Sequence, residues 1–258
     1  MKKIGIIIVI LTISICAAIT YCAYRYYAPP QLILPYHTPQ HDDTLRIAYF
    51  GDSWAFMHKD HNCQIAQLIE DSIHRPAKLH SFGICGLTSK EIYENLFDNS
   101  DFKLFFQKRG YEYCFVSAGI NDTYKKMSTE YYKKSMEAII RFFLYNDIHP
   151  VILEIPNYNI QKAYNWQKQP RKLLRDFSMA LNKIPIDCKQ MFRDALKELI
   201  IEKEFKDKVS IIRYKSWNKD YQNDLRLLYL EDGMHLNPKG YEKLDSVISQ
   251  VIITQITK

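Results

Sequence analysis

A serine, an aspartate and a histidine in this sequence are candidates for one catalytic unit. Ser53 ends the tripeptide Gly51-Asp52-Ser53, and Asp232 and His235 lie about 180 residues further along the chain, three residues apart. A serine hydroxyl becomes a nucleophile when a histidine takes its proton, and a carboxylate bound to that histidine fixes the tautomer of the ring. With Gly233 between them, Asp232 and His235 can share one short loop. The pattern indicates acyl transfer, with Ser53 as nucleophile, His235 as base and Asp232 as the group that orients the base.

Acyl transfer passes through a tetrahedral intermediate with a negatively charged oxygen, and the sequence offers donors for it. They are the backbone N–H groups of Ser53 and Gly86 and the side-chain amide of Asn121. A glycine at position 86 suits this role because it lets the backbone approach a substrate closely. Candidate substrate contacts are Trp54, His58, Tyr124 and Tyr158. The alternative interpretation of these four side chains is ordinary packing.

The elements that must position these residues alternate between strand and helix. Short apolar runs predict strands at residues 47–50, 78–84, 113–118, 151–155 and 209–214. Helical spacing of apolar residues predicts helices at about 60–73, from 89 onward, and at 129–146, 170–182, 187–205 and 239–256. Such alternation is typical of a parallel sheet covered by helices on both faces. Ligands of such sheets bind where the strands end, which is where the candidate residues fall.

Four blocks of the sequence, in this order, resemble the SGNH (GDSL-like) hydrolase family. They are Gly51-Asp52-Ser53, Gly86 within residues 83–89, Gly119-Ile120-Asn121-Asp122, and Asp232-Gly233-Met234-His235. The resemblance covers about residues 45–256. It implies a three-layer α/β/α fold with a five-stranded parallel sheet in the flavodoxin-like order 2-1-3-4-5. It also implies catalysis without a metal ion or organic cofactor.

The family's roles fall on the same residues that the chemistry selects. The resemblance implies Ser53 as nucleophile, Gly86 and Asn121 as oxyanion donors, and Asp232 with His235 as orienting group and base. Two features depart from the family pattern: Trp54 replaces the usual leucine, and residues 157–208 are longer than the minimal fold requires. Both departures lie where a substrate would be selected, so they bear on specificity and leave the expected chemistry unchanged.

The first 28 residues differ in kind from the rest. After Lys2 and Lys3, residues 4–24 carry no charge, and about 20 apolar residues suffice to cross a bilayer. Neither Cys16 nor Cys22 follows a small residue, and no clear Ala-x-Ala cleavage site is present. The segment therefore predicts an uncleaved signal anchor, with a removed signal peptide as the alternative. Because positive charge flanks its N-terminal side, the bulk of the chain is expected outside the cytoplasm, in the periplasm, cell envelope or extracellular space.

The expected organisation is an anchor at residues 1–28, a proline-containing linker at 29–44, and one hydrolase domain at 45–258 with a helical insertion at 157–208. The formal net charge is +6, and half of it belongs to the anchor segment, so nucleic acid is not an expected partner. The cysteines match no metal-binding pattern, although Cys63 and Cys85 are candidates for a disulfide in an exported domain. The sequence carries no signal for the oligomeric state.

We expect a membrane-anchored serine esterase that hydrolyses a short-chain acyl or O-acetyl ester on a small molecule or on an envelope or extracellular glycan. Two alternatives use the same three residues: a lysophospholipase or other lipid esterase, with an acyl channel built from residues 157–208, and an O-acyltransferase. A non-catalytic glycan-binding module is the alternative from a different class.

Overall fold

The computed structural model describes residues 2–34, 42–59, 64–203 and 205–258 of the chain. Its strands are β1 Leu45–Gly51, β2 Ala77–Gly83, β3 Tyr113–Ser117, β4 His149–Leu153 and β5 Ser210–Ile212. Its helices are α1 Lys2–Tyr27, α2 Ser53–His58, α3 Ile65–Ile73, α4 Ser89–Asp98, α5 Ser100–Gln107, α6 Ile120–Lys125, α7 Thr129–Tyr145, α8 Ile160–Trp166, α9 Arg171–Asn182, α10 Lys189–Glu202, α11 Tyr214–Trp217, α12 Tyr221–Leu228 and α13 Pro238–Ile256.

The five strands form one parallel sheet in the order β2-β1-β3-β4-β5, which confirms the predicted topology. β1 lies between β2 and β3, so the connection from β1 leads to the strand on one side of it, and the next connection leads back to the strand on its other side. Gly51 pairs with Gly83 of β2 and with Ser117 of β3, which brings three strand ends to one level. The crevice at such a reversal of strand order is where open parallel sheets bind ligands.

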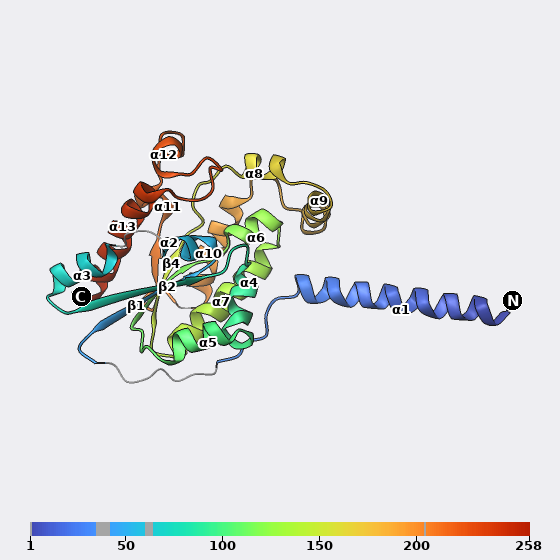
Figure 1. Cartoon of the computed structure of the whole chain (residues 1–258), viewed down its shortest axis with the longest axis horizontal. Coiled ribbons are helices and arrows are strands. Elements are labelled where there is room, and N and C mark those ends of the chain that lie inside the picture. The colour runs from blue at the N-terminus through green and yellow to red at the C-terminus, as the bar shows by residue number, and fades with distance from the viewer. Residues whose placement is uncertain (1, 35–41, 60–63, 204) are drawn as a thin grey trace.

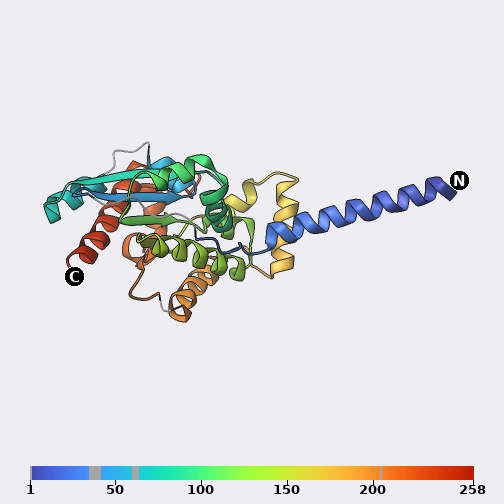
Figure 2. The same ribbon diagram turned by 90° about the horizontal axis from the view of Figure 1, so that it is seen from below.

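Helices cover both faces of the sheet, which confirms the three-layer arrangement (Figure 1). On one face α2 packs on β1 and β2, and α3 packs against α13. On the other face α7 packs between α4 and α10. Figure 2 shows the sheet between these two layers from a second direction.

Neighbouring side chains of β1 form the core on opposite faces of the sheet. Phe50 makes edge-on contacts with Phe102 of α5 and Phe143 of α7, whereas Tyr49 contacts His58 of α2. Both β1 residues are completely buried. Burying one side chain of this size contributes about 2 kcal/mol, and a strand covered on both faces appears as the uninterrupted apolar run noted in the sequence.

Several short helices were absent from the predicted elements. Residues 53–58 form α2, and α3 spans Ile65–Ile73, which confirms the later part of the helix predicted at 60–73; its predicted start at 60–63 lies outside the described residues. The structure also contains α5, α6, α8, α11 and α12, none longer than eight residues. A helix of one or two turns has too few apolar positions to establish a 3.6-residue period.

α1 is a single long helix that extends away from the domain (Figure 1). Its residues Ile7–Tyr27 are long and apolar enough to cross a membrane by length and composition, as an N-terminal signal sequence also can be. The end of α1 contacts the domain. Lys90 of α4 donates to the carbonyl oxygens of Arg25 and Ala28 at 2.5 and 2.8 Å. These bonds satisfy carbonyl groups that a helix end leaves without a partner.

Part of the segment that follows α1 also lies against the domain. Ile33 exchanges two hydrogen bonds with the Tyr93 hydroxyl of α4, at 2.6 and 2.5 Å. The predicted linker is therefore attached to the fold at this point, while its residues 35–41 lie outside the described residues.

Candidate active site

Ser53 lies at the point where β1 turns sharply into α2. The turn requires Gly51, since a Cβ at this position would lie 2.0 Å from the carbonyl oxygen of Ser117. Asp52 then caps α2 by accepting a hydrogen bond from the backbone N–H of Trp54 at 3.0 Å. Ser53 is thus the first residue of the helix, at the carboxyl edge of the sheet, and its side chain retains some exposure.

His235 and Asp232 lie on a tight loop before α13. Gly233 has a φ of +68°, a conformation that favours glycine, and its carbonyl oxygen accepts a hydrogen bond from Tyr221 at 2.8 Å. Asp232 Oδ1 accepts hydrogen bonds from the backbone N–H groups of Met234 and His235, at 2.8 and 3.0 Å. The loop therefore holds the carboxylate and the imidazole in a defined relative position.

The structure brings Ser53, His235 and Asp232 into one chain of hydrogen bonds. His235 Nδ1 lies 2.5 Å from Asp232 Oδ2, and His235 Nε2 lies 2.9 Å from Ser53 Oγ. When Asp232 accepts the Nδ1 proton, Nε2 carries a lone pair that faces the serine hydroxyl. This is the arrangement in which a histidine can take a proton from serine.

Asp232 is held in its charged form. Partial burial alone would raise the pKa of its carboxyl group. The hydrogen bonds from the His235 ring and from the backbone N–H groups of His235 and Met234 outweigh this effect and lower the pKa to about 2. A carboxylate that stays ionised stabilises the positive charge that a base acquires when it accepts a proton.

Asn121 and Gly86 line one cavity, and Asn121 reaches Asp52, the residue before Ser53. The Asn121 amide donates to the carbonyl oxygen of Leu87 at 3.0 Å and lies 3.5 Å from Asp52 Oδ2. Gly86 has a φ of +82°, and a Cβ at this position would meet no atom within 4 Å. The glycine is therefore required by its backbone conformation, and its backbone borders open space.

Asp122 joins the two loops that carry these donors, a role that the sequence analysis did not assign. Its carboxylate accepts from the backbone N–H of Ser89 at 2.8 Å and from the Ser89 hydroxyl at 2.5 Å. Ser89 opens the helix that follows the Gly86 loop, whereas Asp122 follows Asn121 in α6. The position of Asp122 next to Asn121 is the only signal in the sequence that points to this link.

Known structures share this arrangement of strands and helices. A lipase/acylhydrolase from Enterococcus faecalis matches with a TM-score of 0.54 at 14% identity, covering 82% of this chain and 96% of that one. An acetyl xylan esterase matches with a TM-score of 0.55 at 14% identity, covering 81% and 100%. The psychrotrophic esterase EstA from Pseudoalteromonas sp. matches with a TM-score of 0.55 at 14% identity, covering 84% and 100%.

The chain has the SGNH hydrolase fold. Several of the matching structures carry a G-D-S-L or SGNH name, which agrees with the resemblance found in the sequence blocks. No protein-family model matches the chain, and no curated protein matches it by sequence.

Three of the four predicted substrate contacts are buried within the SGNH fold, which corrects that prediction. Trp54 is completely buried and packs edge-on against Trp217, while its carbonyl oxygen accepts from the hydroxyl of Tyr241. Tyr158 is buried and shares a hydrogen bond with Thr123 at 2.7 Å. In each case the α/β core covers the ring, because helices on both faces enclose the side chains next to the strand ends.

His58 is the third buried residue, and it belongs to a second serine–histidine–aspartate arrangement. His58 Nε2 lies 2.8 Å from Asp245 Oδ1, and His58 Nδ1 lies 2.9 Å from Ser81 Oγ. The imidazole and the carboxylate are 0% and 2% exposed, so no substrate can approach this histidine. The arrangement joins α2, β2 and α13 and has a structural role.

Tyr124, the fourth predicted contact, borders a large cavity that begins at the proposed oxyanion donors. The cavity has a volume of about 1500 Å³, and Gly86, Asn121 and Tyr124 line one end of it. The other walls come from α1, α8 and α9. The sequence analysis placed an acyl channel in residues 157–208 only as an alternative, and it assigned no wall to α1.

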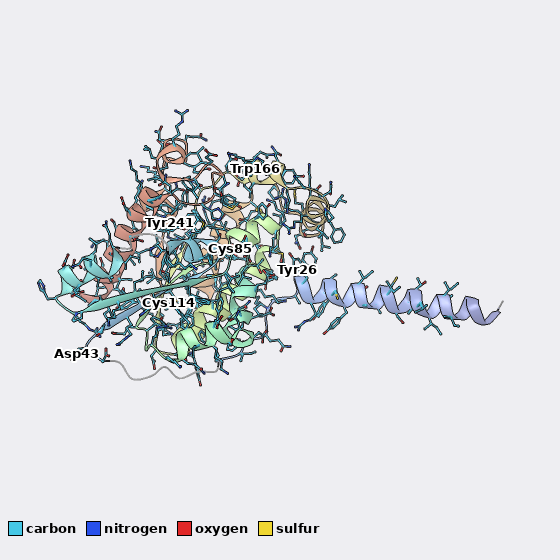
Figure 3. The ribbon with its side chains drawn as sticks, viewed as in Figure 1. Tyr26, Asp43, Cys85, Cys114, Trp166 and Tyr241 are labelled. Carbon is cyan, nitrogen blue, oxygen red and sulfur yellow. The ribbon has the colours of Figure 1, made fainter. Side chains whose placement is uncertain are left out.

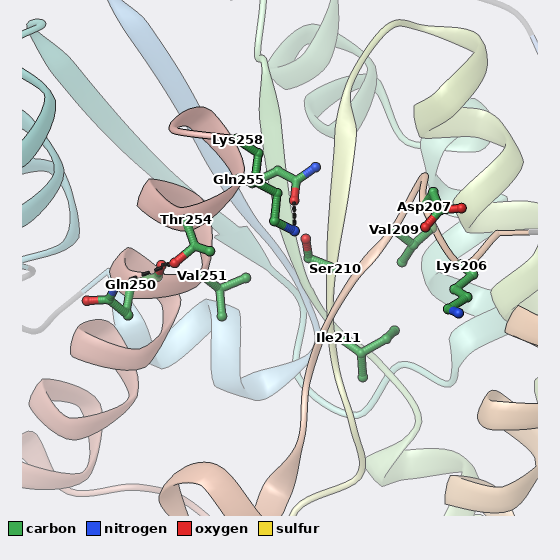
Figure 4. Close-up of a pocket in the computed structure, with 10 residues that line it drawn as sticks. All are labelled: Lys206, Asp207, Val209, Ser210, Ile211, Gln250, Val251, Thr254, Gln255 and Lys258. Carbon is green, nitrogen blue, oxygen red and sulfur yellow. Dashed lines mark hydrogen bonds between the residues drawn. The ribbon is translucent and has the colours of Figure 1, made fainter.

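Other hollows lie away from Ser53. The one in Figure 4 has a volume of about 440 Å³ and lies between the start of β5 and the end of α13, whereas the candidate residues lie at the carboxyl ends of the strands. Among the described residues, no group of three or more His, Cys, Asp or Glu side chains is arranged to hold a metal ion. Cys85 carries a free thiol, and Cys63 lies outside the described residues, so the proposed disulfide stays a prediction.

Asp52 is a buried carboxyl group next to the candidate nucleophile. Burial raises its pKa to about 7, although the hydrogen bond from the Trp54 backbone lowers it in part. In the unfolded chain an aspartate ionises near pH 4. The folded state therefore retains a proton that the unfolded state loses, and the free energy of unfolding falls as the pH rises from about 4 to about 7.

We expect Asp52→Asn to remove this pH-dependent decrease in the free energy of unfolding, because asparagine is neutral and still caps a helix. The stability of the variant relative to the wild type should increase by about 2 kcal/mol between pH 5 and pH 8, measured by urea unfolding of the full chain in detergent. Asp220→Asn is the matched control, because Asp220 caps α12 at an exposed position. An equal pH dependence in both variants would contradict the assigned cause.

Proposed function

We propose that this protein is a serine ester hydrolase anchored in a membrane by α1. The observation that carries the proposal is the chain of hydrogen bonds from Ser53 through His235 to Asp232, at 2.9 and 2.5 Å. The SGNH fold supports it, because the structural neighbours include proteins described as esterases and a lipase/acylhydrolase. We place the domain at residues 45–258 outside the cytoplasm, on the basis of the two lysines that precede α1.

In the proposed mechanism, Ser53 Oγ attacks the carbonyl carbon of the ester while His235 Nε2 takes the hydroxyl proton. The carbonyl oxygen becomes an oxyanion, which accepts hydrogen bonds from the backbone N–H groups of Ser53 and Gly86 and from the Asn121 amide. The amide has two N–H donors, and one of them already holds the Leu87 carbonyl oxygen. The second donates to Asp52 Oδ2 at the longer distance of 3.5 Å, and in the proposed mechanism it exchanges this partner for the oxyanion.

His235 transfers protons both in the formation of the acyl intermediate and in its hydrolysis. His235 returns its proton to the leaving alkoxide as the C–O bond breaks, which leaves an acyl group on Ser53. A water molecule then attacks the acyl carbon, gives one proton to His235 and releases the acid, while Ser53 recovers its proton. An acyltransferase would use a hydroxyl group of an acceptor in place of this water.

Two substrate classes follow from different observations. A short-chain or O-acetyl ester on an envelope or extracellular glycan fits a domain tethered at a membrane, and one structural neighbour is described as an acetyl xylan esterase. An ester of a long-chain amphiphile is favoured by the cavity of about 1500 Å³ that begins at Gly86 and Asn121. The cavity walls include Ile19, Leu174 and Phe177, which suit a hydrocarbon chain.

The test is hydrolysis of 4-nitrophenyl acetate, butyrate and octanoate by the full chain in detergent, with fluorophosphonate labelling of Ser53. We expect hydrolysis of at least one ester and a single labelled serine. A preference for acetate supports the glycan O-acetyl class, and a preference for octanoate supports the amphiphile class. Absence of both hydrolysis and labelling would favour the non-catalytic glycan-binding module.

A further inference from the structure

The helix α9 exposes one apolar face. Leu173, Leu174, Phe177 and Leu181 are between 54% and 65% exposed, and their spacing places them on one side of the helix. The charged residues of α9, which are Arg171, Lys172, Arg175 and Asp176, fall on the other side by the same spacing. A soluble helix normally turns such a face toward the core, so this face requires a partner.

The geometry of α9 relative to α1 identifies the kind of partner. The hydroxyl groups of Tyr27 in α1 and Ser178 in α9 lie 2.5 Å apart. Figure 1 views α9 nearly along its axis and Figure 2 views it from the side, so α9 runs across the direction of α1. If α1 crosses a bilayer, α9 lies in the plane of that bilayer, at its surface. This is the placement of an interfacial amphipathic helix.

The residues around α9 suit a lipid surface. Trp166, at the end of α8, is 66% exposed, and tryptophan is enriched at the interface between lipid and water. Residues 160–183 carry six basic side chains and one acidic one, which favours contact with anionic lipid headgroups. Trp166 and Tyr26 of α1 both line the large cavity, and Figure 3 shows Tyr26 where α1 meets the domain and Trp166 on α8.

The large cavity is lined both by residues of this surface and by the proposed oxyanion donors Gly86 and Asn121. Ile19 and Cys22 of α1 line it together with Leu174 and Phe177 of α9, and Gly86 lies at its other end. Since Ile19 belongs to the apolar stretch Ile7–Tyr27, the cavity opens beside the segment that would lie in lipid. The cavity therefore offers a hydrocarbon chain apolar walls between the lipid-facing segment and the oxyanion donors.

We propose that the α8–α9 segment, residues 160–182, docks on the lipid leaflet next to the domain, and that the cavity takes the hydrocarbon chain of an ester resident in that leaflet. The proposal rests on the esterase function proposed above and selects the amphiphile class of substrate. It gives the apolar face of α9 a partner, and it explains why α1 forms a wall of the cavity.

Tryptophan fluorescence tests the docking independently of catalysis. Trp54 and Trp217 are 0% and 1% exposed, so bromine atoms in lipid chains should quench mainly Trp166. The full chain is placed in vesicles of phosphatidylcholine and phosphatidylglycerol, with or without bromine on the acyl chains. We expect quenching in the brominated vesicles that Trp166→Phe removes. Equal fluorescence in both kinds of vesicle would overturn the proposal.

The double variant Leu173→Glu with Leu181→Glu tests the apolar face, because neither residue lines the cavity. We expect it to lose most of the quenching and to lower, by about tenfold or more, the ratio of octanoate-ester hydrolysis in the vesicle to 4-nitrophenyl acetate hydrolysis in solution. Leu227→Glu is the matched control, since Leu227 is 59% exposed and belongs to α12, a helix that lies away from α1 (Figure 1). A fold defect would lower both rates together and leave the ratio unchanged.

The two proposals fail in different ways. Quenching without hydrolysis of any ester refutes the esterase function and leaves the docking of α9 supported. Hydrolysis of 4-nitrophenyl acetate without quenching of Trp166 supports the esterase and overturns the docking. A double variant that hydrolyses both esters at the wild-type rates also overturns it.

Discussion

Replacing Ser53 by alanine is expected to lower the rate of ester hydrolysis by at least about 10³-fold. The reason is geometric. Ser53 Oγ lies 2.9 Å from His235 Nε2, on a turn that leaves it at the carboxyl edge of the sheet. Alanine removes the atom that forms the acyl intermediate and retains the rest of the site. Hydrolysis of 4-nitrophenyl esters and fluorophosphonate labelling measure the loss.

The second serine–histidine–aspartate arrangement provides a stringent control for this experiment. Ser81 Oγ lies 2.9 Å from His58 Nδ1, and His58 in turn lies 2.8 Å from Asp245, so the pairwise distances resemble those at Ser53. Because His58 is buried, Ser81→Ala should change the rate by less than about threefold. Loss of activity in Ser81→Ala together with full activity in Ser53→Ala would make Ser81 the nucleophile and contradict the assignment of Ser53.

The second large effect is expected from Asp232→Asn, which should reduce kcat by roughly 10⁴-fold. Asp232 accepts a hydrogen bond from the N–H of His235 Nδ1 at 2.5 Å and thereby leaves Nε2 free to accept from Ser53. An asparagine amide can donate to Nδ1 instead, which would place the ring proton on Nε2, facing the serine. The histidine could then no longer act as the base.

Asp232 is expected to act as a carboxylate over the whole pH range of an ester assay. Hydrogen bonds from the His235 ring and from two backbone N–H groups outweigh partial burial and lower the pKa of Asp232 to about 2. Asp232 therefore stays charged at the neutral and mildly acidic pH of an ester assay, so its carboxylate continues to hold His235 Nδ1 there. Glu231→Gln is the control, because Glu231 is an exposed neighbour in the same loop. A variant Asp232→Asn with the wild-type kcat and pH profile would contradict the assigned role.

The catalytic candidates were predictable because their local signals are strong. Gly51-Asp52-Ser53 ends a strand that is buried on both faces, and such a strand appears as a continuous apolar run in the sequence. Asp232 and His235 are close together along the chain, so one loop can hold both. The strand order 2-1-3-4-5 followed from the resemblance of four blocks, and the structure confirms it.

The substrate contacts were not predictable in the same way. Trp54 follows Ser53 directly, yet the helical turn directs its ring into the core against Trp217, where it is completely buried. His58 lies one turn further and binds Asp245, a residue 187 positions away. Whether a side chain next to a nucleophile faces the substrate or the core depends on helices that arrive much later in the chain.

The sequence by itself determined the alternation of strands and helices, the three catalytic candidates and the apolar N-terminal segment. These properties depend on residue type and on spacing along the chain. Only the tertiary structure decided that α1, α9 and the loop of Gly86 enclose one cavity, because their residues come from three distant segments. The spacing of residues within one of these segments cannot predict the cavity walls that the other two segments supply.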